Sequence, residues 1–110
     1  MQINTRRSEQ LAILDVSGDI DLANSPAMRK VLLHELKELR TPRVVLNLKE
    51  VKYIDSSGVA SLVEGLKASR DAGSRFVLFG LSTGVREVMQ LSKLVRIFEI
   101  CENEEDAVVR

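Results

Sequence analysis

Residues Asp55-Ser56-Ser57-Gly58 place a carboxylate, two hydroxyls and a glycine in a row. They follow an aliphatic run, Arg43–Leu48, and precede a pattern typical of an amphipathic helix. The carboxyl ends of parallel strands are where open α/β sheets meet ligands and partners, and a helix N-terminus there favours an anion. A hydroxyl at that position could therefore carry a phosphate with little rearrangement. Gly58 would keep the first helical turn free of side-chain bulk and leave room for a partner.

A simpler interpretation of this tetrapeptide is structural. Serine and aspartate are common helix N-caps, and glycine is common in turns. Taken alone, the four residues favour the capping interpretation, so the surrounding elements decide between the two.

The first half of the chain predicts a β-hairpin and a helix. Strands are expected at Ile3–Arg6 and Leu11–Ser17, with a polar turn between them. Ser25 is expected to be the N-cap and Pro26 the first residue of a helix that runs to about Arg40. Its core-facing residues recur at helical spacing, and they are Met28, Val31, Leu32, Leu36 and Leu39.

The second half alternates strands and helices. The run Arg43–Leu48 is typical of a strand buried on both faces, and the helix after Asp55 ends before Gly73. Strands follow at Arg75–Phe79 and Val95–Ile100. Further helix starts are expected after the caps Ser82 and Asn103, the latter followed by acidic residues that suit a first turn.

This order predicts an α/β fold with a mixed, mostly parallel central sheet of about five strands and packed helices, because alternating strands require crossover connections. The 110 residues suit a single domain over residues 1–110, with 45% apolar and 29% charged residues. Sixteen basic and sixteen acidic residues cancel, which argues against nucleic acid as the main partner. The lone Cys101, the polar N-terminal segment and the lack of a long apolar run favour a cytoplasmic protein without a membrane anchor.

The segment Val44–Val59 resembles the central motif of the STAS domain family, and more narrowly the single-domain bacterial anti-sigma-factor antagonists. Gly18-Asp19-Ile20-Asp21 is similar to an early loop of that family, and Leu91–Phe98 is similar to its late turn and strand. The sequence differs from the common family pattern at three places: Ser82-Thr83-Gly84 stands where Ser-Pro is frequent, Lys93 where glycine is common, and Glu64 where a small residue is frequent.

The resemblance implies a binding protein without catalysis or cofactors. The lack of a long apolar stripe suggesting an obligate dimer favours a monomer in isolation. Such antagonists bind an anti-sigma factor that is also a serine kinase, lose binding when phosphorylated, and are restored by a serine phosphatase. Ser56 is the implied phosphorylation site, and Asp55 is expected to help position its hydroxyl. Glu64 is expected to influence which kinase is recognised. The expected partner-binding residues are Asp21, Asp55, Ser56, Ser57, Gly58, Ser61 and Glu64.

Other function classes find less support in the residues. A serine hydrolase needs a base beside its nucleophile, and the only histidine, His34, falls on the charged side of the first helix. The sequence lacks the P-loop pattern that would indicate a nucleotide-binding module. His34, Cys101 and the Asp19/Asp21 pair are too few for a metal site. An accessory STAS subunit of a membrane transport or signalling complex stays open as the main alternative.

Overall fold

A single five-stranded sheet forms the centre of the computed structural model, which describes residues 1–109. The strands lie in chain order and are β1 (Gln2–Ser8), β2 (Leu11–Ser17), β3 (Arg43–Glu50), β4 (Arg75–Phe79) and β5 (Glu99–Cys101). β1 and β2 pair antiparallel as a hairpin, and every later pair is parallel. The predicted mixed, mostly parallel sheet is confirmed.

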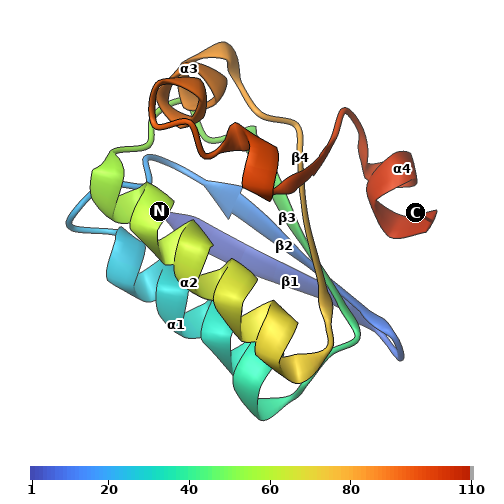
Figure 1. Cartoon of the computed structure of the whole chain (residues 1–110). Coiled ribbons are helices and arrows are strands. Elements are labelled where there is room, and N and C mark those ends of the chain that lie inside the picture. Colours follow the sequence, from blue (N-terminus) through green and yellow to red (C-terminus); the bar gives the residue numbers. More distant parts are fainter. Residues whose placement is uncertain (110) are drawn as a thin grey trace.

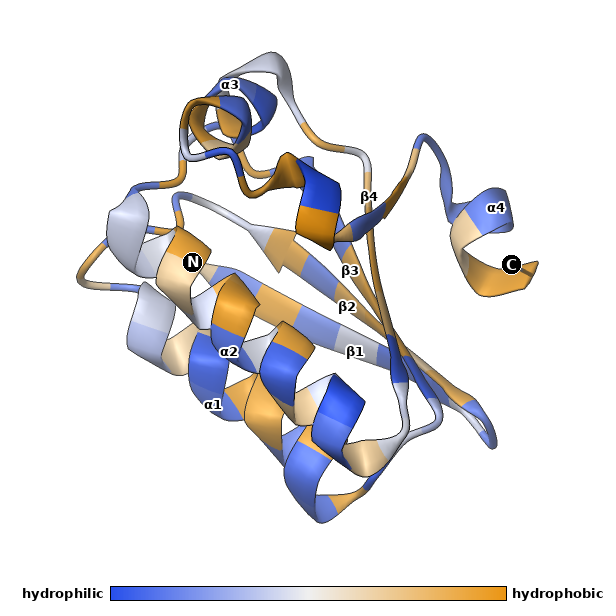
Figure 2. Cartoon of the chain, in the orientation of Figure 1, coloured by the Kyte–Doolittle hydropathy of each residue, from blue (hydrophilic) through white to orange (hydrophobic). Residues whose placement is uncertain are grey.

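The helices connect the parallel strands and pack on the sheet. They are α1 (Ser25–Leu33), α2 (Ser56–Ala72), α3 (Thr83–Leu91) and α4 (Glu104–Val109), with a π-helical turn η1 (His34–Glu38) and a 3-10 turn η2 (Val95–Ile97). Figure 1 shows α1 and α2 side by side over one face, and α3 beyond the carboxyl ends of the central strands. In Figure 2 the edge strand β1 is mostly hydrophilic.

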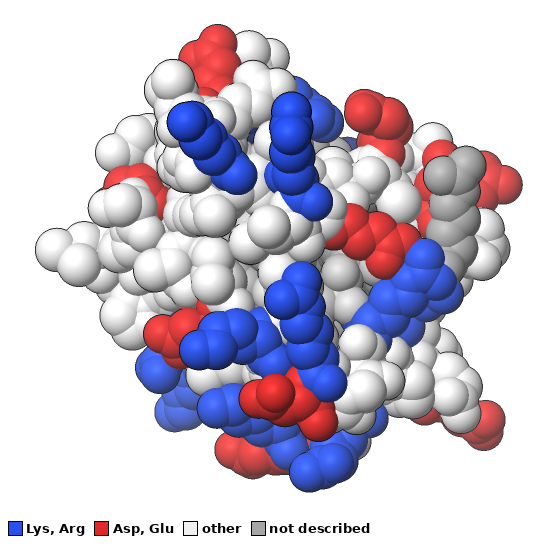
Figure 3. Space-filling view, in the orientation of Figure 1, with Lys and Arg blue, Asp and Glu red and all other residues white. Residues whose placement is uncertain are grey.

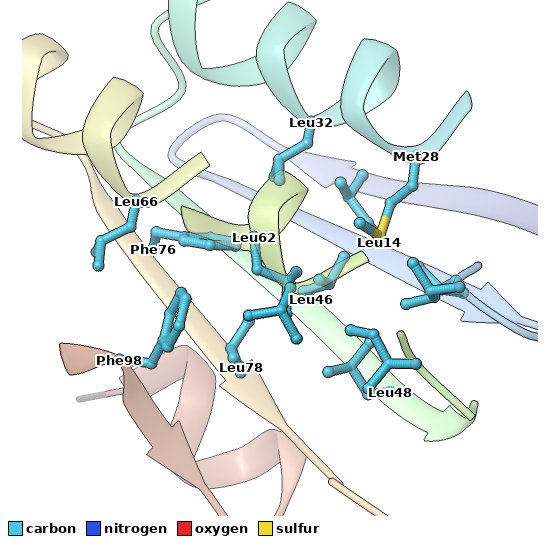
Figure 4. Close-up of a cluster of buried hydrophobic side chains, with 14 of the residues drawn as sticks. Leu14, Met28, Leu32, Leu46, Leu48, Leu62, Leu66, Phe76, Leu78 and Phe98 are labelled. Carbon is cyan, nitrogen blue, oxygen red and sulfur yellow. The ribbon is translucent and has the colours of Figure 1, made fainter. Parts of the chain in front are cut away.

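Two apolar layers hold the sheet. The larger layer lies between the sheet and the α1/α2 pair and includes Leu14, Met28, Leu46 and Leu62, as the side chains in Figure 4 show. The smaller layer lies on the other face, where Val45, Val77 and Phe79 pack with Ala107 of α4. Alternate residues of β3 enter opposite layers, so this strand is buried on both faces, as its aliphatic sequence predicts.

The start of α1 differs from the prediction. Asn24, not Ser25, is the N-cap, and Ser25 is a buried first residue of the helix. The turn before the helix explains this, because the Asp21 carbonyl oxygen accepts from the Ser25 amide at 2.8 Å and the Asp21 carboxylate accepts from the Asn24 amide at 2.9 Å. These bonds satisfy amides that would otherwise need a side-chain cap.

The end of α1 also differs, since the chain widens into η1 before Arg40. The Leu39 amide bonds the His34 carbonyl at 3.0 Å, five residues back, and the extra residue in this turn rotates the expected core residue Leu39 out to solvent. Glu35 is buried instead, where Thr41 donates to it at 2.8 Å and Arg7 forms an ion pair with it.

The predicted last strand, Val95–Ile100, begins too early. Val95–Ile97 forms η2, and the strand β5 covers only Glu99–Cys101. The Leu94 amide bonds back to Met89 at 3.1 Å and the Ile97 amide to Leu94 at 3.2 Å. These bonds keep the chain coiled until it reaches the sheet edge beside β4.

Candidate functional site

Asp55 is the N-cap of α2 and holds the first turn of the helix. Its Oδ1 accepts from the amide of Ser57 at 2.9 Å and from the amide of Gly58 at 3.1 Å, and it also accepts the Ser57 hydroxyl. The Ser57 hydroxyl and these amides hold the pKa of the Asp55 carboxyl below its usual range. Asp55 is therefore an ionised, fixed negative charge at the helix start.

The other oxygen of Asp55 links this helix start to the loop before α1. Oδ2 accepts from the amide of Leu22 at 3.0 Å. The Asp55 amide donates to Ile20 at 3.1 Å, the Ile20 amide donates to Tyr53 at 3.0 Å, and Ile20 forms a parallel bridge with Ile54. Two loops at the carboxyl edge of the sheet are thus bonded into one surface.

Ser56 is the first residue of α2, and its side chain is exposed. Within residues 1–109 its hydroxyl takes part in no hydrogen bond, whereas the neighbouring Ser57 is half-buried and bonded to Asp55. Asp55 forms no hydrogen bond with the Ser56 hydroxyl in this geometry, since its oxygens accept from Leu22, Ser57 and Gly58. Ser56 is consequently the hydroxyl of the pair that is open to an approaching protein.

Gly58 has a different role from the one expected. A Cβ at this position would lie 2.6 Å from the Ile20 carbonyl oxygen and 2.6 Å from Ile54 Cγ1. The glycine lets the loop that contains Ile20 pack against the helix, so its space is filled by the chain itself and is not left for a partner.

Three other expected partner-binding residues are held by contacts within the chain. The Asp21 carboxylate accepts from the Asn24 amide. Ser61 is 5% exposed and its hydroxyl donates to the Ser57 carbonyl at 3.2 Å, so its side chain cannot reach a partner in this conformation. Glu64 is exposed and forms an ion pair with Arg29 of α1, which partly balances its charge.

The sequence analysis missed two apolar side chains beside this helix start. Leu22 is 75% exposed and Tyr53 is 51% exposed, and both belong to the loops that are bonded around Asp55. The apolar Leu22, directly after the loop residue Asp21, was the available signal for one of them. Figure 3 shows a largely uncharged surface over the N-terminal half of α2. We call Leu22, Tyr53 and Ser56 the serine surface.

The only histidine of the sequence does not lie beside Ser56. His34 lies in η1, beyond the C-terminal end of α1, and its Nδ1 is 2.8 Å from Glu38. Over the described part of the chain, no cluster of three or more His, Cys, Asp or Glu side chains could hold a metal ion. Nor does any helix there have the length and apolar character needed to cross a bilayer.

The fold and this helix start define a STAS domain. Residues 2–107 match the STAS domain family, and the chain belongs to that family. The resemblance noted from the central motif is confirmed.

Similar proteins carry more specific names. The chain is 33% identical to the anti-sigma-B factor antagonist of Listeria monocytogenes, over 91% of this chain and 86% of that protein. A crystal structure of a candidate anti-sigma factor antagonist from Thermotoga maritima has the same fold, with a TM-score of 0.89, 24% identity and coverage of 96% and 91% of the two chains. The phosphorylated form of SpoIIAA from Bacillus matches with a TM-score of 0.74, 18% identity and coverage of 97% and 96%.

Proposed function

We propose that this protein is an anti-sigma factor antagonist that binds an anti-sigma serine kinase through the serine surface and is released when Ser56 is phosphorylated. The observation that carries the proposal is the exposed Ser56 hydroxyl, which makes no hydrogen bond within residues 1–109 beside a helix cap already formed by Asp55. The name of the Listeria relative supports the class of function, and the phosphorylated form of SpoIIAA shows that a protein of this fold can be phosphorylated. A serine phosphatase would restore the binding form, and the protein itself would act by binding and not by catalysis.

The local charges explain why a phosphate would change binding more than folding. A phosphoserine carries about −1.5 to −2 charge near pH 7 and would lie at the positive end of the α2 dipole, which stabilises it. The ionised Asp55 next to it has the opposite effect. These two local terms oppose each other, so we expect the fold to persist after modification.

A bound partner changes this balance because it removes water from the serine surface. Leu22 and Tyr53 supply apolar area of the kind that forms the centre of protein interfaces. A dianion brought into such a contact beside Asp55 loses its hydration and meets a fixed like charge. Like charges juxtaposed in an interface cost several kcal/mol, and about 4 kcal/mol corresponds to roughly a thousandfold in affinity.

Titration calorimetry against the anti-sigma kinase of the same organism tests the proposal. We expect Ser56→Ala to bind as tightly as the unphosphorylated protein and not to be released by ATP, and Ser56→Asp to bind at least tenfold more weakly. Ser8→Asp adds the same charge on the exposed end of β1 and is the matched control, with unchanged affinity. Equal affinities for the three Ser56 forms, or no binding by the wild type, would overturn the proposal.

A further inference from the structure

Helices α2 and α3 end in the same hydrogen-bonded motif. After α2, the amide of Gly73 bonds Arg70 at 3.2 Å and the amide of Ser74 bonds Ser69 at 2.8 Å. After α3, the amide of Lys93 bonds Gln90 at 3.0 Å and the amide of Leu94 bonds Met89 at 3.1 Å. Both are Schellman motifs, in which one residue after the helix takes the left-handed conformation.

The residue in that conformation is Gly73 with φ +69° after α2, but Lys93 with φ +59° after α3. Glycine adopts this conformation freely, whereas the Cβ of any other L-residue crowds the backbone. Lys93 is exposed and forms no ion pair with the carboxylates of residues 1–109. The fold therefore holds a strained lysine where glycine would be more stable, and within residues 1–109 its side chain forms no hydrogen bond or ion pair that would compensate.

The surroundings of Lys93 have the character of an interaction surface. A shallow hollow of about 530 Å³ is lined by Gln90, Lys93, Val95 and Arg96. Leu91, which is 85% exposed, and the partly exposed Ile97 lie next to these residues in the sequence. Arg96, like Lys93, has no carboxylate partner in the described chain, whereas Arg6 and Arg75 form ion pairs on the opposite face of the sheet.

This surface adjoins the serine surface. α3 begins against the loop that leads to Ser56, since a Cβ at Gly84 would lie 2.7 Å from the Lys52 carbonyl oxygen. Figure 3 shows basic side chains over α3 and η2 bordering the uncharged area over the N-terminal half of α2. A protein that covers the serine surface can extend onto this second region without crossing an acidic barrier.

We propose that Leu91, Lys93, Arg96 and Ile97 form a second contact region for the anti-sigma factor, which presents an acidic segment with an apolar side chain to it. This inference rests on the proposed function and adds the chemistry of the partner's contact. The unpaired cations favour a partner that carries carboxylates, and the exposed Leu91 offers apolar area to an apolar side chain of that partner. Two cations and two apolar side chains are a weak anchor for an anionic membrane, which needs a larger basic cluster, so a protein is the better match.

Lys93→Gly separates a role in binding from a structural role, because the two effects have opposite signs. Removing the Cβ relieves the left-handed strain, and we expect Tm to rise by about 4 °C. Removing the charge weakens affinity for the anti-sigma factor, by about tenfold in low salt and less at high ionic strength. Arg96→Gln lowers affinity in the same salt-dependent way. Lys37→Ala in η1 removes an exposed lysine at the far end of α1 and leaves affinity unchanged.

Three results would overturn the inference, and they are distinguishable. If Lys93→Gly and Arg96→Gln bind like wild type while Ser56→Asp binds weakly, the second contact region is wrong and the proposed function stands. If the wild type does not bind the anti-sigma factor, both fail. If affinity for that protein is unchanged but wild type sediments with phosphatidylglycerol vesicles and Lys93→Gly does not, the surface serves a membrane instead.

Discussion

Helices α2 and α3 begin at the same edge of the sheet, directly after the parallel strands β3 and β4 and their short connecting loops. Each has a glycine in its first turn that packs on a backbone carbonyl, Gly58 on Ile20 and Gly84 on Lys52. The caps differ. At α3 the Ser82 hydroxyl accepts from the Val85 amide at 3.3 Å, whereas at α2 the carboxylate of Asp55 is the cap.

This difference explains why one serine is available for modification and the other is not. The hydroxyl of Ser82 already accepts a hydrogen bond from its own helix, so adding a phosphate there would alter the cap. At α2 the carboxylate of Asp55 forms the cap and also accepts the Ser57 hydroxyl, which leaves the Ser56 hydroxyl exposed and without a hydrogen bond within residues 1–109. Under the proposed function, an acidic cap before a serine lets one residue stabilise the helix while the next carries the phosphate.

The largest expected difference between the two helix starts comes from filling their glycine contacts. Gly58→Ala places a methyl group within 3 Å of one carbonyl and two Ile side-chain atoms, and we expect it to reduce the free energy of unfolding by about 3 kcal/mol. Gly84→Ala meets one carbonyl, at the less buried start of α3, and should cost about 1 kcal/mol. Urea unfolding of both variants measures the difference. Equal losses would show that the loop containing Ile20 moves aside easily.

The second largest expected difference is in the stability lost when each helix cap is removed. Ser82→Ala removes one hydrogen bond to a helix amide and should cost about 1 kcal/mol. Asp55→Ala should cost more, because it removes bonds to two helix amides, the Ser57 hydroxyl and the Leu22 amide. Thermal unfolding compares the variants, with Asp55→Ser as a partial rescue. A smaller loss for Asp55→Ala than for Ser82→Ala would contradict the structural account of the α2 start.

The smallest expected effect is a pH dependence that belongs to α2 and not to α3. Hydrogen bonds lower the pKa of folded Asp55, so its contribution to stability is present above its unfolded pKa and is lost as pH falls through the folded value. Asp55→Asn should therefore flatten the fall in stability below about pH 4. Arg6 lowers the pKa values of Asp15 and Glu104, so acid sensitivity from that cluster should remain.

Ser82→Ala is the control for this pH experiment, because its cap does not titrate. Its free energy of unfolding should lie below that of the wild type by the same amount at every pH from 2 to 7, as measured by urea unfolding. If Asp55→Asn behaved in the same way, the carboxylate of Asp55 would not be the group responsible.

The sequence predicted the sheet, its parallel order and the place of Ser56 because these follow from apolar runs, helix spacing and one motif. It could not predict the π-helical turn η1. The hydrogen bond from Leu39 to the fifth preceding residue changes which side Leu39 faces, but the spacing of apolar residues in the sequence stays that of an α-helix. The sequence also could not predict the 3-10 turn η2, because Val95–Ile97 has the β-branched composition of a strand.

Within the site, the sequence identified the residues but not which atoms they use. The same Asp-Ser-Ser-Gly spacing permits Asp55 to bond either hydroxyl, and only the helix geometry shows that it bonds Ser57. Ser61 faces inward because it lies one turn after Ser57 on the side of α2 that packs on the domain. Leu22 has a local signal, but its position near Tyr53 depends on how two distant loops meet, which no local pattern contains.

Mapping the phosphate by mass spectrometry after incubation with ATP and the anti-sigma kinase tests the central claim most directly. The account predicts one modified residue, Ser56, with unmodified Ser57 and Ser82 and no incorporation into Ser56→Ala. Phosphate on Ser57 or Ser82 in the wild-type protein, or undiminished incorporation into Ser56→Ala, would contradict it.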